Sequence, residues 1–357
     1  MEINLENEQA ESFSLQLKTA KKKELAALIR YFFTAATQEE QALLKEFANE
    51  LREKYYGRKV YFRALLEFSN YCRNDCYYCG LQRSNQTVPR YRLSPEEILT
   101  CCQEGYSLGF RTFVLQSGED PYFSDERLCR LVAKIKESFP ACAVTLSVGE
   151  RSKKSYQELF NAGVDRYLLR HETANEAHFG KLHPQELTLK QRQECLYNLK
   201  EIGFQVGAGF MVDSPFQTYD TLAEDLIFLR ELQPHMIGIG PFIPHAQTRF
   251  AGYYQPTAHR TLLILSLLRI MLPKALLPST TALGSVDAHG REKGLGAGAN
   301  VLMPNLSPVK HRADYDIYDY KVSMGWEAAE YLPELSRHLQ GLGFMPDFSR
   351  GDYVDFT

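Results

Sequence analysis

Short apolar runs alternate with helix-like segments from residue 58 onward, and this alternation limits the fold more than any other feature of the chain. The runs that predict strands are residues 61–68, 112–117, 143–148, 166–171, 205–212, 236–240, 275–281 and 299–303. Strands that alternate with helices form a parallel sheet covered on both faces, and eight of them close a (βα)8 barrel. We therefore predict an α/β fold, a (βα)8 TIM-type barrel, with a doubly wound open sheet as the alternative.

Helical periodicity accounts for the segments between these strands and for the start of the chain. Apolar residues three or four positions apart predict helices at residues 95–108, 125–139, 154–162, 189–202, 219–231, 258–272 and 287–296. Residues 23–33 and 39–56, before the first strand, show the same spacing. We expect an N-terminal helical extension over residues 1–57, a barrel over residues 58–320, and a C-terminal segment, residues 321–357, that packs on the barrel.

The composition argues against several classes of protein. A net charge of −3 gives no reason to expect nucleic-acid binding. No apolar run reaches the roughly 18 residues of a membrane-spanning helix, and the N-terminus lacks the apolar stretch of a signal peptide. Eight cysteines in 357 residues are ordinary usage rather than a disulfide framework. We expect a cytoplasmic protein that binds neither nucleic acid nor membrane.

Three cysteines follow the first predicted strand. Cys72, Cys76 and Cys79 have the spacing Cys-x3-Cys-x2-Cys, with Tyr78 before the last of them. Three thiolates on so short a loop can bind one iron–sulfur cubane, and the iron without a cysteine keeps an open position, which is where metal sites do chemistry. Half of a zinc site and buried apolar packing are the alternatives. The other cysteines, which we expect to be core thiols, are Cys101, Cys102, Cys129, Cys142 and Cys195.

A short polar segment follows the second predicted strand. The strand ends at Ser117, and Gly118 and Glu119 come directly after it, at the end of the barrel where enzymes of this fold place their chemistry. The glycine lets a ligand approach the backbone closely, and Glu119 then directs a carboxylate at the barrel mouth. The alternative is an ordinary turn.

Charged residues end the fourth predicted strand and continue in the helix after it. Alternation along the strand puts Arg170 and Glu172 on one side and His171 on the other. A carboxylate can accept both hydroxyls of a ribose, and an arginine can bind a carboxylate. Arg192, in the helix that follows, could reach over the same mouth. The alternatives are a structural ion pair for Arg170 and Glu172, a solvated helix charge for Arg192, and a packed ring for His171.

The last strands carry groups suited to a flat ring and to a polar ligand. Glycines and prolines at the end of the sixth strand leave few bulky side chains there. This suits stacking of an adenine on the backbone and on Ile239 or Phe242. The seventh strand ends in hydroxyls that include Thr280 and Thr281, which could bind an anion or a small polar ligand. The alternative is that these hydroxyls cap the following segment.

Taken together, these motifs resemble the HydE family of [FeFe]-hydrogenase maturases. This family lies within the radical S-adenosylmethionine (SAM) superfamily and is related to biotin synthase and methylornithine synthase. The matching stretches, besides the three cysteines, are residues 67–70, 79–81, 90–92, 115–122, 170–175, 239–245, 280–284 and 298–305.

The resemblance implies a function and a set of site residues. A [4Fe-4S] cluster on the three cysteines would bind SAM and cleave it to a 5′-deoxyadenosyl radical, which acts on a small sulfur-containing substrate or small iron complex during hydrogenase maturation. The expected SAM-binding residues are Ser117, Gly118, Glu119, Arg170, Glu172, Arg192 and Ile239, and the expected substrate residues are Thr280, Thr281, Tyr315 and Tyr318. The expected partners are a reductant such as a ferredoxin or flavodoxin, and other hydrogenase maturases. A related enzyme of the biotin synthase or methylornithine synthase type, or a non-catalytic iron–sulfur scaffold, is the alternative.

The chain departs from the family pattern in two places. Family members commonly have Gly-Leu-Pro-Gly-Gln-Thr after the fifth strand, where this chain has Asp213-Ser-Pro-Phe-Gln-Thr218. We expect the bulkier Asp213 and Phe216 to lie near the SAM site. Some relatives also carry extra C-terminal cysteines for a second cluster. The last cysteine here is Cys195, so we expect that cluster to be absent.

Overall fold

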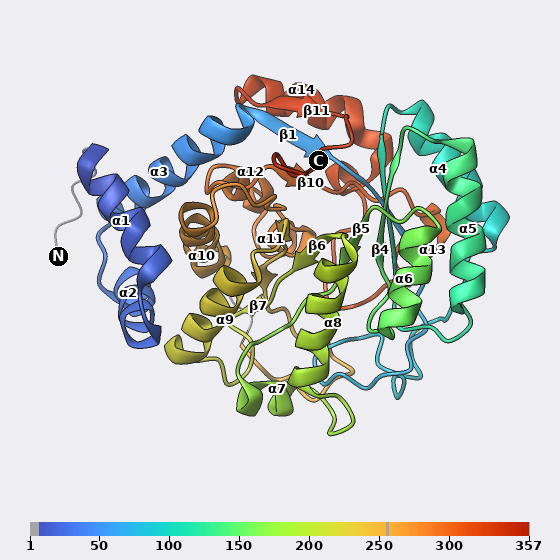
Figure 1. The fold of residues 1–357 in the computed structure, drawn as a ribbon, viewed down its shortest axis with the longest axis horizontal. Helices are drawn as coiled ribbons and strands as arrows, with labels where there is room; N and C mark the ends of the chain where they lie inside the picture. The colour runs from blue at the N-terminus through green and yellow to red at the C-terminus, as the bar shows by residue number, and fades with distance from the viewer. Residues whose placement is uncertain (1–6, 255–256, 357) are drawn as a thin grey trace.

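A closed ring of parallel strands forms the centre of the molecule in a computed structural model that describes residues 7–254 and 257–356 (Figure 1). Six strands pair in the order β2 (Ala64–Ser69), β3 (Thr112–Ser117), β4 (Ala143–Ser147), β5 (Arg166–Leu168), β6 (Gln205–Ala208) and β8 (Met236–Ile237). On the other side, β10 (Val301–Leu302) pairs in parallel with β1 (Lys59–Phe62), which runs on into β2. Parallel bridges from Met236 to Leu276 and from Pro278 to Val301 close the ring. The prediction of a TIM-type barrel is confirmed.

The predicted strands are shorter in the structure than in the sequence pattern. The seventh, predicted at residues 275–281, contributes only the bridges at Leu276 and Pro278, and Thr281 already begins α11 (Thr281–Val286). A proline cannot donate to a ladder, which limits pairing there. The fifth predicted run is broken between β6 and β7 (Met211–Val212) at Gly209, where an added Cβ would lie 1.9 Å from the carbonyl oxygen of Gly238. Close backbone contact thus interrupts the ladder next to the cavity described below.

Helices cover the outside of the ring. They are α4 (Pro95–Ser107), α5 (Asp125–Ser138), α6 (Lys153–Asn161), α8 (Leu189–Ile202), α9 (Tyr219–Leu232), α10 (Ala258–Met271) and α12 (Gly290–Leu295). Several begin with the expected cap: Ser94 accepts a hydrogen bond from the backbone of Glu97, and Pro95 occupies the first helical position. No helix of the described residues is long and apolar enough to cross a membrane.

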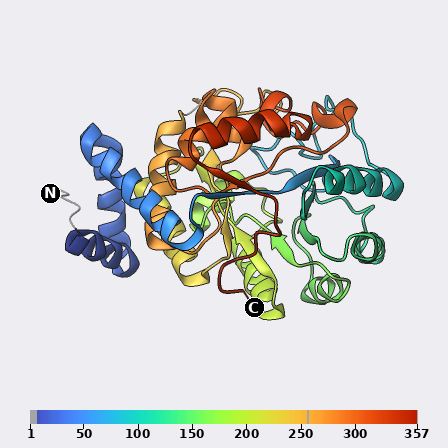
Figure 2. The same cartoon turned by 90° about the horizontal axis from the view of Figure 1, so that it is seen from above.

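Three helices precede the barrel and lie to one side of it in both views (Figures 1 and 2). They are α1 (Asn7–Thr19), α2 (Lys22–Thr34) and α3 (Gln38–Tyr56). The second packs on α9, and the first and third pack on α10. The boundary of a separate extension at residue 57 stays a prediction.

The sequence pattern did not indicate several later elements. They are α7 (Glu176–Leu182), α13 (Val309–Arg312), the 3-10 helices Gly325–Glu327 and Ala329–Tyr331, α14 (Leu332–Gly341) and β11 (Met345–Asp347). The last of these pairs in parallel with β1, so the end of the chain extends the sheet beside the barrel. Before it, residues 314–321 cross the mouth of the barrel, and we call this segment the strap.

Hydrogen bonds from one buried arginine connect the end of α10 to the barrel. Arg269 is fully buried and donates to the carbonyls of Gly298, Pro273 and Ala275 at 2.7–2.8 Å and to the side chain of Asn300 at 3.1 Å.

We expect Arg269→Met to lower the free energy of unfolding by about 3 kcal/mol, because it leaves several buried acceptors without donors. Urea denaturation measures the change. The exposed Arg30→Met on α2 serves as the control and should stay within about 0.5 kcal/mol of the parent. Equal losses in the two variants would show that the Arg269 hydrogen bonds contribute nothing specific.

Candidate functional site

One cavity of about 380 Å3 opens at the carboxyl ends of the strands, inside the barrel. Its lining comes from the cysteine loop after β2, from the ends of most of the strands, and from the strap. All three cysteines of the loop line it, and so do Tyr315 and Tyr318 of the strap. The structure therefore brings the expected cluster ligands and the expected substrate residues to one enclosed space.

Backbone contacts hold the cysteine loop over this cavity. The amide of Arg73 donates to the carbonyl of Glu119 at 2.9 Å, and the amide of Gly80 donates to Ile317 of the strap at 3.0 Å. The backbone contacts at Gly80 of the loop and at Gly118, which faces the loop, are too close to admit a side chain at either position. An added Cβ on Gly80 would lie 2.1 Å from the carbonyl oxygen of Asp316, and one on Gly118 would lie 2.3 Å from that of Tyr71.

The donor set of the loop fits an iron–sulfur cluster. Cys72, Cys76 and Cys79 are partly buried, free of disulfides, and close enough to influence one another electrostatically. Burial, together with the neighbouring Cys72, raises the pKa of Cys79 to about 12, so three thiolates here need a bound cation to compensate their charge. No three Cys, His, Asp or Glu side chains of the described residues converge as ligands of one metal ion. A [4Fe-4S] cluster needs one cysteine per iron rather than several ligands on one ion, so the three cysteines suit three of its irons.

The remaining cysteines lie away from the cavity. Four of the five are buried and Cys129 is partly buried, and none lines the barrel interior. The fourth iron of a cluster on the loop would therefore have no cysteine among the described residues near it.

The segment after β3 lies directly against the cysteine loop. Ser117, Gly118 and Glu119 all line the cavity. The Glu119 carboxylate pairs with Arg73 at 3.0 Å and accepts the amide of Glu150 at 2.9 Å. Glu119 thus ties the loop to the next strand, in addition to facing the cavity.

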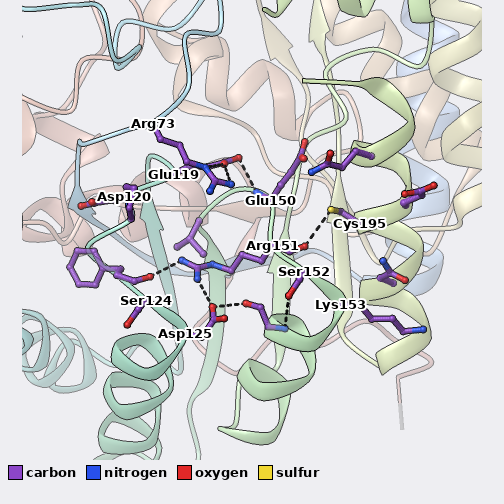
Figure 3. Close-up of a pocket in the computed structure, with 17 residues that line it drawn as sticks. Arg73, Glu119, Asp120, Ser124, Asp125, Glu150, Arg151, Ser152, Lys153 and Cys195 are labelled. Atoms are coloured by element: carbon purple, nitrogen blue, oxygen red, sulfur yellow. Dashed lines mark hydrogen bonds and ion pairs between the residues drawn. The ribbon is translucent and has the colours of Figure 1, made fainter. Parts of the chain in front are cut away.

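A second cavity, of about 460 Å3, lies on the far side of Glu119, between the ends of β3 and β4 and α8 (Figure 3). Its lining is polar and the prominent charges are already paired: Arg73 with Glu119, and Arg151 with Asp125 at 2.5 Å. The buried thiol of Cys195 donates to the carbonyl of Arg151 at 3.6 Å. The two cavities share Glu119 as part of their common wall.

Arg170, Glu172 and Arg192 meet at one side of the barrel cavity. Arg170 and Glu172 approach to 3.1 Å, yet the approaching atoms, Nη2 and Oε2, make no hydrogen bond, and Nε of Arg170 also has no partner among the described residues. Arg192 donates to the carboxylate of Glu150 and, at 2.7 Å, to the carbonyl of Arg170. Burial acts to lower the pKa of Arg192, but the neighbouring Glu150 carboxylate acts to raise it, and the pKa lies above its usual value. This buried guanidinium therefore stays charged.

His171 takes no part in this group. Its ring is fully buried and packs 4.8 Å from Phe228 and 5.7 Å from Phe210, measured between ring centroids, so the side chain faces away from the cavity as the strand alternation predicts. Burial lowers the pKa of His171 to about 3.

Hydroxyl groups and a buried ion pair form the opposite side. Thr280 and Thr281 both line the cavity. The hydroxyl of Thr280 donates to the carbonyl of Ile239 at 3.3 Å and makes no cap bond to α11, while that of Thr281 donates to Glu327 at 2.9 Å. Glu327 also accepts from Arg291, whose Nε and Nη1 have no partner among the described residues.

The structure does not place the side chain of Ile239 at the cavity. Its side chain is 1% exposed within the main hydrophobic core and does not line the cavity, whereas Phe242 and Ile243 do. Strand β8 ends at Ile237, and pairing resumes only at β9 (Gly240–Pro241). Regular alternation therefore does not extend through Gly238, and the residue after it turns into the core.

The departure from the family pattern after β7 also lies elsewhere than we expected. Asp213 and Phe216 do not line the barrel cavity. Asp213 pairs with Arg260 at 2.9 Å, and Phe216 is 47% exposed on the surface. Neither bulky side chain of this loop thus contributes to the cavity wall.

Two further charged residues, Lys321 and Glu67, lie at the cavity and were not predicted as site residues. The ammonium of Lys321, on the strap, donates to Glu67 of β2 at 2.6 Å, and Asn305 donates to the same carboxylate at 2.8 Å. The side chains of Lys321 and Glu67 are 7% and 1% exposed, and both residues line the cavity. A glutamate inside the apolar run 61–68 was the available signal, because a carboxylate in a buried strand needs a partner.

Comparison with known proteins agrees with this geometry. A radical SAM superfamily domain matches residues 66–229. The chain is 44% identical to the [FeFe] hydrogenase maturase subunit HydE of Thermotoga maritima, over 86% of this chain and 87% of the relative. It is 27% identical to a 3-methylornithine synthase of Methanosarcina acetivorans, over 89% of each chain.

Two solved structures share the fold. Methylornithine synthase (PylB) superposes with a TM-score of 0.79 at 23% identity, over 94% of this chain and 97% of that one. The maturase HydG from Carboxydothermus hydrogenoformans superposes with a TM-score of 0.79 at 21% identity, over 98% and 81%. Radical SAM enzymes use a [4Fe-4S] cluster and SAM, and the donor set of the cysteine loop fits such a cluster. The chain belongs to the HydE family of radical SAM enzymes.

Proposed function

We propose that this enzyme cleaves SAM reductively in the barrel cavity and directs the resulting 5′-deoxyadenosyl radical at a small sulfur-containing substrate in [FeFe]-hydrogenase maturation. The observation that carries the proposal is the single cavity that joins the three cysteines to the strap tyrosines. The bound cluster supplies the electron that breaks the sulfonium C–S bond of SAM. The protein supplies position and excludes water.

The unpartnered groups of the cavity suggest how SAM is held. Glu172 offers a carboxylate to the ribose hydroxyls, and Arg170 offers a guanidinium to the SAM carboxylate, since both carry buried atoms without hydrogen bonds. Arg192 holds Arg170 in place by donating a hydrogen bond to the backbone carbonyl of Arg170. Ser117, Gly118 and Glu119 lie beside Cys72, where the methionine end of SAM would lie.

The substrate end lies across the cavity. Thr280 and Thr281, with Tyr315 and Tyr318, present hydroxyl groups that can hold a small polar ligand or small iron complex. The strap carries both tyrosines, so it positions the substrate residues and closes the mouth. Other hydrogenase maturases are the partners we propose for substrate and product transfer. All eight cysteines are unpaired, which supports a location in the reducing cytoplasm.

The direct test is SAM cleavage. We expect the anaerobically reconstituted protein, with dithionite and SAM, to form 5′-deoxyadenosine and methionine in equal amounts, as measured by chromatography. The same protein without dithionite is the control and should form neither. An intact cluster without product would support the alternative of a non-catalytic iron–sulfur scaffold.

A further inference from the structure

We propose that an acidic one-electron carrier protein docks on a surface patch beside the cysteine loop and delivers there the electron that SAM cleavage requires. The patch, which we call the carrier patch, consists of Tyr77, Lys181, Phe216, Arg249 and Tyr253. This inference rests on the proposed function, because only an enzyme that cleaves SAM reductively needs such a carrier. One electron leaves the reduced carrier and enters the cluster on the three cysteines, and the transfer makes and breaks no bond.

Exposed aromatic rings form the apolar part of the carrier patch. Phe216 is 47% exposed and Tyr253 is 39% exposed, with 5.8 Å between their ring centroids. Both rings pack edge-on against Phe250, which belongs to a small hydrophobic cluster separate from the main core. Tyr77 and Tyr78 of the cysteine loop pack against that same cluster. The patch and the loop thus share one apolar base.

Two cations complete the carrier patch. The ammonium of Lys181 lies 5.0 Å from the ring centroid of Phe216, and the guanidinium of Arg249 lies 3.6 Å from that of Tyr77. Both side chains belong to exposed residues, and neither forms an ion pair with a carboxylate of the described residues. The whole chain has a net charge of −3, so this positive patch is a local feature. Such a patch attracts an acidic partner and orients it before contact.

The backbone at Phe216 lies in a strained conformation. Phe216 has a φ of 66° and Asp213 a φ of 60°, in the left-handed region that costs a non-glycine residue about 1 kcal/mol or more. Asp213 is fixed by Arg260 and by the side chain of Gln217, which accepts its amide at 2.7 Å. Phe216, in contrast, directs a half-exposed aromatic ring to the surface. A docked partner would cover that ring.

The carrier patch is joined directly to the cluster ligands. Tyr77 follows Cys76 in the chain, and its amide donates to the carbonyl of Leu182 at 3.0 Å, next to Lys181. Interfaces of electron-transfer partners are small, and interface cores are rich in aromatic residues and arginine. The three rings and the arginine of the carrier patch, at the edge of the cysteine loop, match that description.

The first experiment measures binding without turnover. The probe is an acidic bacterial ferredoxin with two [4Fe-4S] clusters, titrated calorimetrically into the cluster-loaded enzyme at about 20 mM salt, where charges are weakly screened. We expect Lys181→Glu/Arg249→Glu to raise the Kd by about tenfold or more, and added salt to weaken binding of the parent. The matched control is Arg58→Glu/Lys274→Glu, the same charge change on one exposed and one partly buried residue at the opposite, amino-terminal end of the strands. Equal losses in both double variants would overturn the proposal.

A second variant separates docking from folding. Phe216→Gly relieves the left-handed backbone, so we expect its melting temperature to stay close to that of the parent while the ferredoxin Kd rises severalfold. An unchanged Kd would show that the ring plays no part in docking.

The activity readout separates this inference from the proposed function. We expect ferredoxin-driven formation of 5′-deoxyadenosine to fall in Lys181→Glu/Arg249→Glu in proportion to the loss of binding, while dithionite-driven formation stays at the parent rate. Parent-like ferredoxin-driven rates at limiting ferredoxin would overturn the docking site. Absence of product from the parent with dithionite would instead contradict the proposed function, and the binding measurements would still decide whether the carrier patch binds ferredoxin.

Discussion

Cys76→Ala should abolish both the cluster and SAM cleavage. Cys76 lines the cavity together with Cys72 and Cys79. No fourth cysteine of the described residues lies there to replace it. We expect the iron bound after reconstitution to fall from about four per chain to near zero, since a cubane rarely survives on two protein thiolates. Formation of 5′-deoxyadenosine should drop by about a thousandfold or more, to the limit of detection. Iron analysis, electron paramagnetic resonance and product chromatography measure the three effects.

The matched control for this variant is Cys195→Ala. Cys195 is a buried free cysteine outside the barrel cavity, so its removal should leave iron content and cleavage unchanged. Retained SAM cleavage in Cys76→Ala would refute the assignment of the cluster ligands. Loss of the cluster in both variants would indicate that reconstitution depends on the fold rather than on the cysteine loop.

The barrel could be predicted from the sequence because its first strands are long and apolar. Strand β3 matches its predicted range, and the helix before β6 matches as well. The later strands are short because glycine and proline interrupt them: Gly209 lies against Gly238, and Pro278 cannot donate to the ladder. Apolar periodicity marks where a strand passes through the core, and it does not mark where close backbone contact ends the pairing.

The site residues, too, could be predicted from the sequence only in part. Residues on the cysteine loop and directly after the strands lie in the cavity as expected, because the short spacing keeps the cysteines together and the carboxyl ends of the strands meet at one end of the barrel. Ile239 follows an irregular break, and its direction could not be predicted. Lys321 and Glu67 are 254 positions apart and meet only because the strap crosses the mouth of the barrel. No local pattern carries that information.

Glu172→Gln should weaken SAM binding without changing the cluster. The substitution keeps the shape of the side chain and removes the charge of a carboxylate that lies in the cavity, with one oxygen that makes no hydrogen bond and lies 3.1 Å from Arg170. Hydrogen bonds to a charged group contribute about 1.5–3 kcal/mol, so we expect the Kd for SAM to rise by about 10- to 100-fold. Equilibrium dialysis on the oxidised, cluster-loaded protein measures the Kd, and electron paramagnetic resonance of the reduced protein without SAM should match the parent.

The same variant distinguishes a SAM ligand from a structural ion pair. If Glu172 only balances Arg170, its loss should lower the melting temperature and leave the Kd for SAM unchanged. The matched control is Glu330→Gln, which breaks the ion pair with Arg312 outside the cavity and should affect stability alone. The backbone of Glu172 has a φ of 65°, which favours the ligand role. A non-glycine residue held in that conformation costs backbone energy. An ordinary surface ion pair does not require that cost.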